Sequence, residues 1–151
     1  MPKLSKTLII RHRPDQIFEL ISDVGRYPEF IKWIRTMRVM NKREADGRTL
    51  FRGEASVGFK GFSERFATDV VADPAARSIK VELAHGPFKR LNNTWDLKAD
   101  ADDNTVIDFF IDYEFRNPVL SLLARANTEL AVNKIMNAFR QEADRRYGGA
   151  P

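Results

Sequence analysis

The stretch of sequence that decides the fold is IDFFIDYEFRNPVLSLLARANTELAVNKIMNAFRQEADRRY, residues 107–147. Apolar residues occupy every second position from Ile107 to Phe115, which is the period of a β-strand with one buried face. Directly afterwards, Asn117 is suited to cap a helix and Pro118 suits its first position. The pattern predicts one long helix that reaches to about Tyr147. A strand with one apolar face needs a cover, and the helix that follows it can supply one.

The same period of two extends upstream to Met37. Turn signals divide residues 37–115 into about six strands; they are Asp46-Gly47, Asp73-Pro74, His85-Gly86-Pro87 and Asp102-Asp103-Asn104. A glycine-rich hairpin is also expected where Gly58 and Gly61 flank Phe59-Lys60. The segment as a whole therefore predicts an antiparallel meander with one buried face.

The N-terminal part predicts one strand and two helices. The strand is expected over 3–11, the first helix over 14–24 with Pro14 in its first turn, and a second, shorter helix from Pro28. The fold class is therefore α+β, with one curved antiparallel sheet covered by one long C-terminal helix. A chain of 151 residues without repeats or linkers is expected to form a single domain over 1–151.

Composition excludes several classes of site. The chain has no cysteine, so disulfides, thiolate nucleophiles and cysteine metal sites are excluded. His12 and His85 are far apart and have no partners at ligand spacing, so we expect no metal site. The sequence shows no nucleotide-binding or serine hydrolase motif. It also shows no membrane span and no secretory signal, and we expect a cytoplasmic location.

Positive charge is concentrated in the first part of the chain. Residues 1–65 hold 14 Lys and Arg against 8 Asp and Glu, whereas the net charge of the whole chain is +4. The basic residues include Lys32, Arg35, Arg38, Lys42, Arg43, Arg48 and Arg52. Such a patch suits RNA phosphates or anionic lipid headgroups. Because acidic residues are interleaved, a solvated face of strands and loops is the alternative interpretation.

Phenylalanine is frequent, with 11 residues, and the pattern places several on the presumed concave face of the sheet. They are Phe51, Phe59, Phe62, Phe66, Phe109 and Phe115. An aromatic concavity suits a large apolar ligand, although plain core filling needs the same residues. Glu64 lies between Phe62 and Phe66 and is expected to point inward. It could act as a catalytic carboxylate, as a polar anchor for a ligand, or as an ordinary carboxylate at the rim.

The long helix carries two apolar stripes on roughly opposite sides. The first stripe is Val119, Leu122, Leu123, Ala126 and Leu130, and the second is Val132, Ile135, Met136, Phe139 and Ala143. We expect the second stripe to pack permanently on the sheet. The first is expected to cover a cavity entrance and to face partly outward, which makes Leu122 and Leu123 gate candidates. A kink, a wide buried face or a dimer contact would also explain two stripes.

Three strings, in this order, resemble the START-like, or polyketide cyclase-like, superfamily. They are DVGRYPEFIKWI (residues 23–34), GPFKRLNNTW (residues 86–95) and DYEFRN (residues 112–117). Within the superfamily the chain is similar to the coenzyme Q-binding family and its bacterial relative, the ribosome association toxin, over about residues 3–147. Lys32 and Ile34 depart from the family pattern, which usually has Pro and Cys at these two positions.

The resemblance implies a helix-grip fold in which the sheet wraps around the C-terminal helix and encloses an apolar tunnel. It also implies a carrier or chaperone that binds ubiquinone or a similar polyisoprenoid lipid and supports respiration, not an enzyme. Carried over by position, the ligand-binding residues are Tyr27, Pro28, Phe30, Trp33, Phe88, Leu91 and Trp95. To these the residue pattern adds Phe62, Glu64, Phe66 and Phe115.

The ligand's ring is expected near a polar rim formed by Asn92, Asn93 or Glu64. Lys32, Arg35 and Arg38 are membrane-contact candidates, and we expect a monomer that touches the cytoplasmic face of the inner membrane transiently. No catalytic cofactor is expected. A ribosome-associated regulator remains the alternative, and an aromatase/cyclase-type enzyme is a third.

Overall fold

The structure is a computed structural model that describes residues 3–59 and 62–148, without the side chains of Phe59 and Phe62. The tip of the expected glycine-rich hairpin, Lys60-Gly61, lies outside the described residues. The elements are β1 (Lys3–Ile10), α1 (Pro14–Ser22), the 3₁₀ helix η1 (Val24–Glu29), β2 (Ile34–Ala45), β3 (Arg48–Phe59), β4 (Phe62–Asp73), β5 (Ser78–His85), β6 (Phe88–Ala99), β7 (Thr105–Phe115) and α2 (Pro118–Tyr147).

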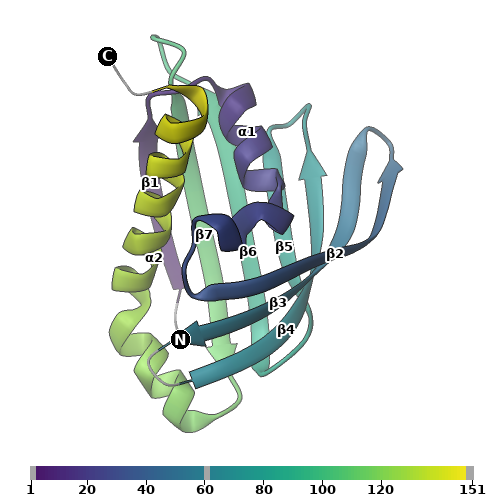
Figure 1. Ribbon diagram of the computed structural model, residues 1–151, viewed down its shortest axis with the longest axis vertical. Coiled ribbons are helices and arrows are strands. Elements are labelled where there is room, and N and C mark those ends of the chain that lie inside the picture. The colour runs from purple at the N-terminus through teal and green to yellow at the C-terminus, as the bar shows by residue number, and fades with distance from the viewer. Residues whose placement is uncertain (1–2, 60–61, 149–151) are drawn as a thin grey trace.

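Seven strands form one antiparallel sheet in the order β1-β7-β6-β5-β4-β3-β2. Consecutive strands pair from β2 to β7, and β7, the last strand, also pairs with β1, the first. Figure 1 shows that β2 and β3 run across the direction of β6 and β7, so the sheet curls around the side where α1, η1 and α2 lie. The predicted α+β class and the helix-grip arrangement are therefore confirmed.

Most predicted boundaries agree with the structure, but the second short helix was predicted in the wrong place. The first helix ends at Ser22, because Asp23 leaves the helical conformation. A 3₁₀ turn then begins at Val24 and contains Pro28 near its end, instead of starting there. Its turn is closed by the Phe30 N–H, which donates to the Tyr27 carbonyl at 3.1 Å. The Tyr27 hydroxyl also donates to the Ile21 carbonyl and ties η1 to α1.

The second half of α2 forms the centre of the core. Phe139 is 1% exposed, and its ring contacts those of Tyr27, Phe30 and Trp95 at centroid distances of 5.2, 5.3 and 5.3 Å. Four members of the second stripe are buried; they are Val132, Met136, Phe139 and Ala143. The expected permanent packing of this stripe on the sheet is confirmed.

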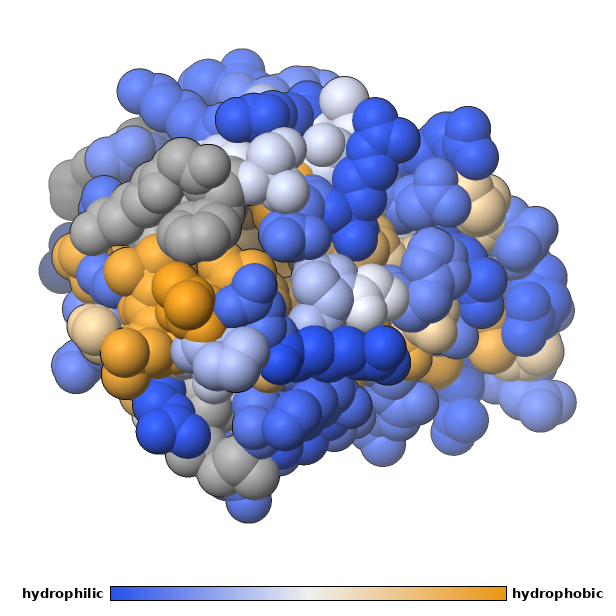
Figure 2. Space-filling view, turned by 90° about the horizontal axis from the view of Figure 1, so that it is seen from below, coloured by the Kyte–Doolittle hydropathy of each residue, from blue (hydrophilic) through white to orange (hydrophobic). Residues whose placement is uncertain are grey.

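The first half of α2 is packed much less. Val119, Leu122 and Leu130 are 66%, 69% and 48% exposed, whereas Leu120, between the stripes, is buried. In Figure 2, which views the molecule from below, apolar residues gather over the start of α2. The second half of α2 therefore packs in the core, whereas the first half exposes apolar side chains to solvent.

The start of α2 is fixed by its cap. The Asn117 side chain accepts hydrogen bonds from the N–H groups of Val119 and Leu120 at 2.8 and 3.3 Å. We expect Asn117→Ala to lower the free energy of unfolding by about 1 kcal/mol, because two helical donors lose their acceptor. Urea denaturation measures this. Asn117→Asp is the control and should retain most of the stability, and equal losses in both variants would contradict the role of the cap.

Candidate functional site

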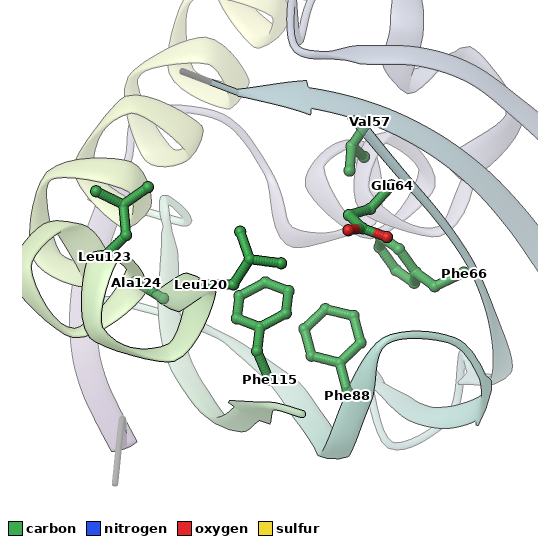
Figure 3. A pocket seen from close by; sticks show the side chains of 8 residues that line it. All are labelled: Val57, Glu64, Phe66, Phe88, Phe115, Leu120, Leu123 and Ala124. Atoms are coloured by element: carbon green, nitrogen blue, oxygen red, sulfur yellow. The ribbon is translucent and has the colours of Figure 1, made fainter. Parts of the chain in front are cut away.

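A small apolar pocket lies beneath the first half of α2 (Figure 3). Its volume is about 100 Å³. The lining residues come from five elements and include one titratable side chain; they are Val57, Glu64, Phe66, Phe88, Phe115, Leu120, Leu123 and Ala124. We call this space the apolar pocket. Its lining suits a hydrocarbon group.

Three phenylalanine rings form the wall opposite the helix. Phe88 stacks on Phe115 at 4.5 Å and meets the edge of Phe66 at 5.2 Å. Phe88 and Phe115 are partners across β6 and β7, so the register of the sheet places them side by side. Gly86 lets Phe66 lie close to the turn between β5 and β6, since a Cβ on Gly86 would lie 2.5 Å from the Cβ of Phe66. The φ of Gly86, +149°, also favours glycine.

Glu64 points inward, as the alternation on β4 predicted. It is half-buried and its carboxylate faces the space between β4 and α2 (Figure 3). No second acid, histidine or lysine lines the apolar pocket among the described residues. General acid–base catalysis needs a positioned group matched to a partner or a substrate proton, and a lone carboxylate fits the role of a polar anchor better.

The predicted ligand-binding residues divide into three groups instead of lining one continuous cavity. Glu64, Phe66, Phe88, Phe115 and the gate candidate Leu123 meet at the apolar pocket. Phe30, Lys32 and Trp33 line a separate open groove. Tyr27, Leu91 and Trp95 belong to the packed interior, and Pro28 is half-buried in η1. Within the described residues these groups do not form the expected continuous tunnel, because the rings of Tyr27, Phe30 and Trp95 pack around Phe139 and fill the interior.

The remaining predicted residues lie away from the apolar pocket. Asn92 is exposed, and Asn93 accepts a hydrogen bond from Trp95 Nε1 and donates to the Phe110 carbonyl, both at 2.8 Å. Neither asparagine therefore supplies a polar rim to this pocket. The side chain of Phe62 lies outside the described part of the chain. Leu122 is exposed on α2.

Three lining residues were missed by the sequence analysis as part of a site: Val57, Leu120 and Ala124. Val57 continues the alternation of β3 and could have been included. Leu120, Leu123 and Ala124 have the i, i+3, i+4 spacing of one helical face. Leu120 and Ala124 belong to neither of the two longer stripes, so this shorter face was not recognised as part of a site.

A hydrogen-bonded group separates the two halves of α2. The Tyr113 hydroxyl and Thr128 Oγ1 lie 2.6 Å apart, and Thr128 Oγ1 donates to the Ala124 carbonyl at 2.7 Å. Asn127 Nδ2 donates to the Leu123 carbonyl, also at 2.7 Å. Side chains that bond to the carbonyl four residues earlier compete with the helix backbone and favour bending. Burial raises the pKa of Tyr113, so the hydroxyl stays protonated.

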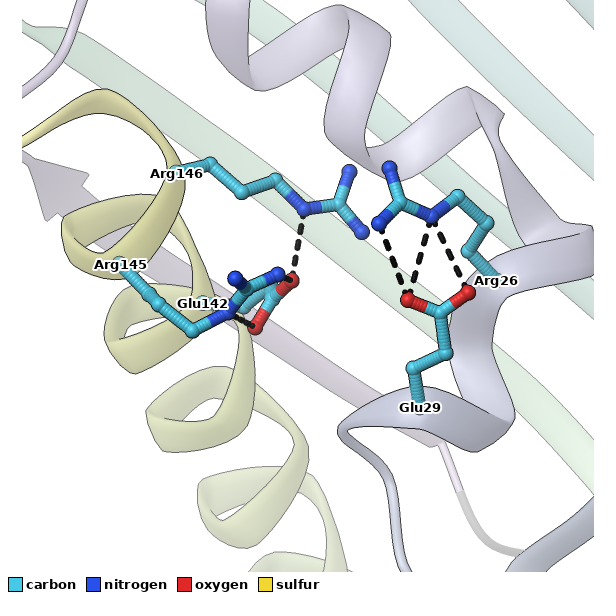
Figure 4. Close-up of polar contacts among 5 residues, drawn as sticks. All are labelled: Arg26, Glu29, Glu142, Arg145 and Arg146. Atoms are coloured by element: carbon cyan, nitrogen blue, oxygen red, sulfur yellow. Dashed lines mark hydrogen bonds and ion pairs between the residues drawn. The ribbon is translucent and has the colours of Figure 1, made fainter.

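The other end of α2 holds a cluster of charges (Figure 4). Glu142 is 6% exposed and accepts from Arg145 at 2.8 and 2.6 Å and from Arg146 at 2.6 Å. The hydrogen bonds from Arg145, followed by those from Arg146, lower the pKa of Glu142 to about 2. Arg26 and Glu29 form a separate, exposed pair at 3.0 Å. The hydrogen bonds of Glu142 lie within the last turns of α2, far along the helix from the apolar pocket.

Several of the predicted basic residues have acidic partners on the neighbouring strand. Arg48 pairs with Asp73 at 3.2 Å and Arg52 with Asp69 at 3.0 Å. The membrane candidate Arg38 lies 3.6 Å from Glu54. These arginines behave as a solvated strand face, which was the alternative interpretation of the basic patch. Lys32 lies elsewhere, at the open groove, and Arg35 donates to Ser63 Oγ at 3.3 Å on the outer face of the sheet.

In the described part of the chain, no helix is long and apolar enough to cross a membrane. Within residues 3–59 and 62–148, no three side chains of His, Asp or Glu come together in a way that could hold a metal ion.

A curved antiparallel sheet that holds an apolar pocket beneath a long C-terminal helix defines the START-like class of proteins. The chain belongs to the polyketide cyclase / dehydrase and lipid transport family, whose model matches residues 10–140.

Similar proteins carry different functional names. The ribosome association toxin RatA of Pseudomonas aeruginosa is 30% identical over 145 residues, which are 96% of this chain and 97% of that one. The mitochondrial coenzyme Q-binding protein coq10 of Schizosaccharomyces pombe is 27% identical, over 89% of this chain and 82% of its own. The solution structure of the 18 kDa protein CC1736 from Caulobacter crescentus has a TM-score of 0.83 and 39% identity, covering 99% of this chain and 100% of that one.

Proposed function

We propose that the protein binds ubiquinone or a similar polyisoprenoid lipid, with part of the tail in the apolar pocket, and acts as a carrier or chaperone for respiration. It works as a monomer at the cytoplasmic face of the inner membrane and is not an enzyme. The observation that carries this proposal is the apolar pocket itself, with three phenylalanines and two leucines around one carboxylate. Coq10, a relative over 82% of its length, is named for coenzyme Q binding.

Loading requires movement of the first half of α2. A volume of about 100 Å³ holds only a few methylene-sized groups, far less than an isoprenoid tail. Leu122 and Leu123 lie on the helix half that closes the pocket, and Leu122 is already 69% exposed. The first half of α2 can move outward about a hinge at Thr128, which is hydrogen-bonded to Tyr113. Each methylene buried contributes about 0.8 kcal/mol, so an opened pocket would bind a tail tightly.

The second candidate function is a ribosome-associated regulator. It is favoured by the 30% identity to a ribosome association toxin over 97% of that protein. Exposed Lys42 and Arg43 on β2 would face RNA phosphates. A cyclase-type enzyme is supported less well, since the apolar pocket offers Glu64 without a second titratable group among the described lining residues.

One preparation tests both candidates. Protein purified from a quinone-producing host is extracted with organic solvent for mass spectrometry, and a second aliquot is sedimented with ribosomal subunits. Stoichiometric quinone or isoprenoid lipid in the extract supports the carrier function. An extract free of lipid, together with saturable sedimentation, would replace it with the ribosome-directed function.

We expect Ala124→Phe to abolish retention of the lipid, because Ala124 lines the apolar pocket and a benzyl group would occupy it. Ala126→Phe is the matched control, since Ala126 is exposed on the same helix two residues away. Mass spectrometry of the bound lipid measures the difference, and far-UV circular dichroism checks the fold. Equal retention by the two folded variants would show that the lipid lies elsewhere.

A further inference from the structure

The open groove differs in chemistry from the apolar pocket. It lies between the second half of α2 and the segment joining η1 to β2, and its volume is about 580 Å³. Nine described residues line it, and none is acidic. Lys32 and Lys134 contribute two positive charges from opposite sides, while Asn137 and Gln141 add amide donors. Trp33 supplies an aromatic surface beside Lys32.

A third cation lies close by but does not line the groove. Gly58 forms part of the lining, and a Cβ on Gly58 would lie 2.2 Å from Nη2 of Arg35. Arg35 Nη1 donates to Ser63 Oγ at 3.3 Å, and Ser63 lies on the face of β4 opposite to Glu64, which lines the apolar pocket. Arg35 therefore lies on the outer face of the sheet, and the cations among the described lining residues of the groove are Lys32 and Lys134.

The groove continues the exposed apolar stripe of α2. Steps of three and four residues keep side chains on one face of a helix, and the following residues obey this spacing and are all exposed: Val119, Leu122, Ala126, Leu130, Lys134, Asn137 and Gln141. This outer face is apolar over its first half and polar with a positive charge over its second. Its two halves match the two parts of a phospholipid.

We propose that the groove binds the phosphate of an anionic bilayer lipid through Lys32 and Lys134, while the exposed apolar stripe contacts the acyl region. The inference rests on the membrane location in the proposed function but goes beyond the proposed cargo, because a neutral quinone ring offers no charge to two lysines. RNA would offer phosphates as well, but it would leave Leu122 and Leu130 in water. The lipid alone uses both halves of the outer face.

Vesicle flotation tests the proposal with the full chain. Wild-type protein should bind phosphatidylglycerol vesicles and bind phosphatidylcholine vesicles weakly. Replacing the two groove lysines, Lys32→Gln with Lys134→Gln, should weaken binding to phosphatidylglycerol tenfold or more, on the order expected for two lysines at an anionic surface. The control, Lys42→Gln with Lys80→Gln, removes the same charge from exposed strand positions and should change binding less than threefold. Equal weakening by both pairs would overturn the site in favour of diffuse charge attraction.

The ligand class is tested by nuclear magnetic resonance. Dihexanoyl phosphatidylglycerol below its micelle concentration should shift the amide signals of Lys32, Trp33 and Lys134 more than inorganic phosphate does. A larger shift with a short RNA oligonucleotide would overturn the lipid assignment. All groove variants should still carry the lipid that co-purifies in the apolar pocket, so a failure here is separate from a failure of the carrier function.

Discussion

Phe139→Ala is expected to lower the free energy of unfolding by about 3–5 kcal/mol, which corresponds to a fall in melting temperature of roughly 6–20 °C for a chain of this size. Phe139 is 1% exposed and its ring meets three others, so truncation leaves a cavity that its neighbours cannot fill. Urea denaturation of the purified variant measures the loss.

Leu122→Ala is the matched control on the same helix. Because Leu122 is 69% exposed, the change should cost less than about 0.5 kcal/mol. A Leu122 variant as unstable as the Phe139 variant would mean that both halves of α2 belong to the core. The gate proposed for the first half would then fail.

Glu142→Gln is expected to cost about 3 kcal/mol at pH 7. The carboxylate is 6% exposed and Arg146 is 10% exposed, so the neutral amide leaves a buried guanidinium without its counter-charge. Arg145 is 62% exposed and can turn to solvent, which limits the loss. Chemical denaturation at pH 7 measures it. Glu29→Gln is the control and should cost under about 1 kcal/mol, because the Arg26–Glu29 pair is exposed.

The same carboxylate predicts a pH dependence. Its pKa in the folded protein is about 2, below the ordinary value of 4.5, so the unfolded chain takes up its proton first as the pH falls. The stabilisation is complete above pH 4.5 and is lost as the pH falls through 4.5 toward 2. The difference in stability between wild type and Glu142→Gln should therefore shrink over this range. A difference that stays constant from pH 7 to pH 3 would contradict the lowered pKa.

The fold could be predicted because its signals are local. The alternation from Ile107 to Phe115 and the Asn117-Pro118 start of the helix depend on neighbouring residues, and the structure confirms both as β7 and α2. The burial of the second stripe also followed from helical periodicity. Pro28 misled because a proline suits a 3₁₀ turn as well as the first turn of a helix.

The candidate site could be predicted only in part. Alternation on β4 placed Glu64 and Phe66 on one face, and the structure brings them together with Phe88 and Phe115. Alternation cannot tell whether an inward aromatic ring lines a space or fills it. The ring of Trp95 fills the interior, because it packs against Phe139, which lies on α2, 44 positions later in the chain.

The groove was not predictable as a unit. Lys32 and Lys134 are separated by 102 positions in the sequence. No periodicity links residues in a connecting segment to a face of a distant helix.

The position of β2 at the end of the sheet order has a consequence for solubility. A free strand edge offers unpaired N–H and C=O groups to any other extended chain, and such edges promote aggregation unless they are protected. Here the pairing of β2 with β3 is interrupted between Met40 and Arg43, and Asn41 takes a φ of +56°. Exposed Lys42 and Arg43 lie at this irregularity. Together they discourage the addition of a further strand, so part of the positive charge on β2 serves to keep copies of the protein apart.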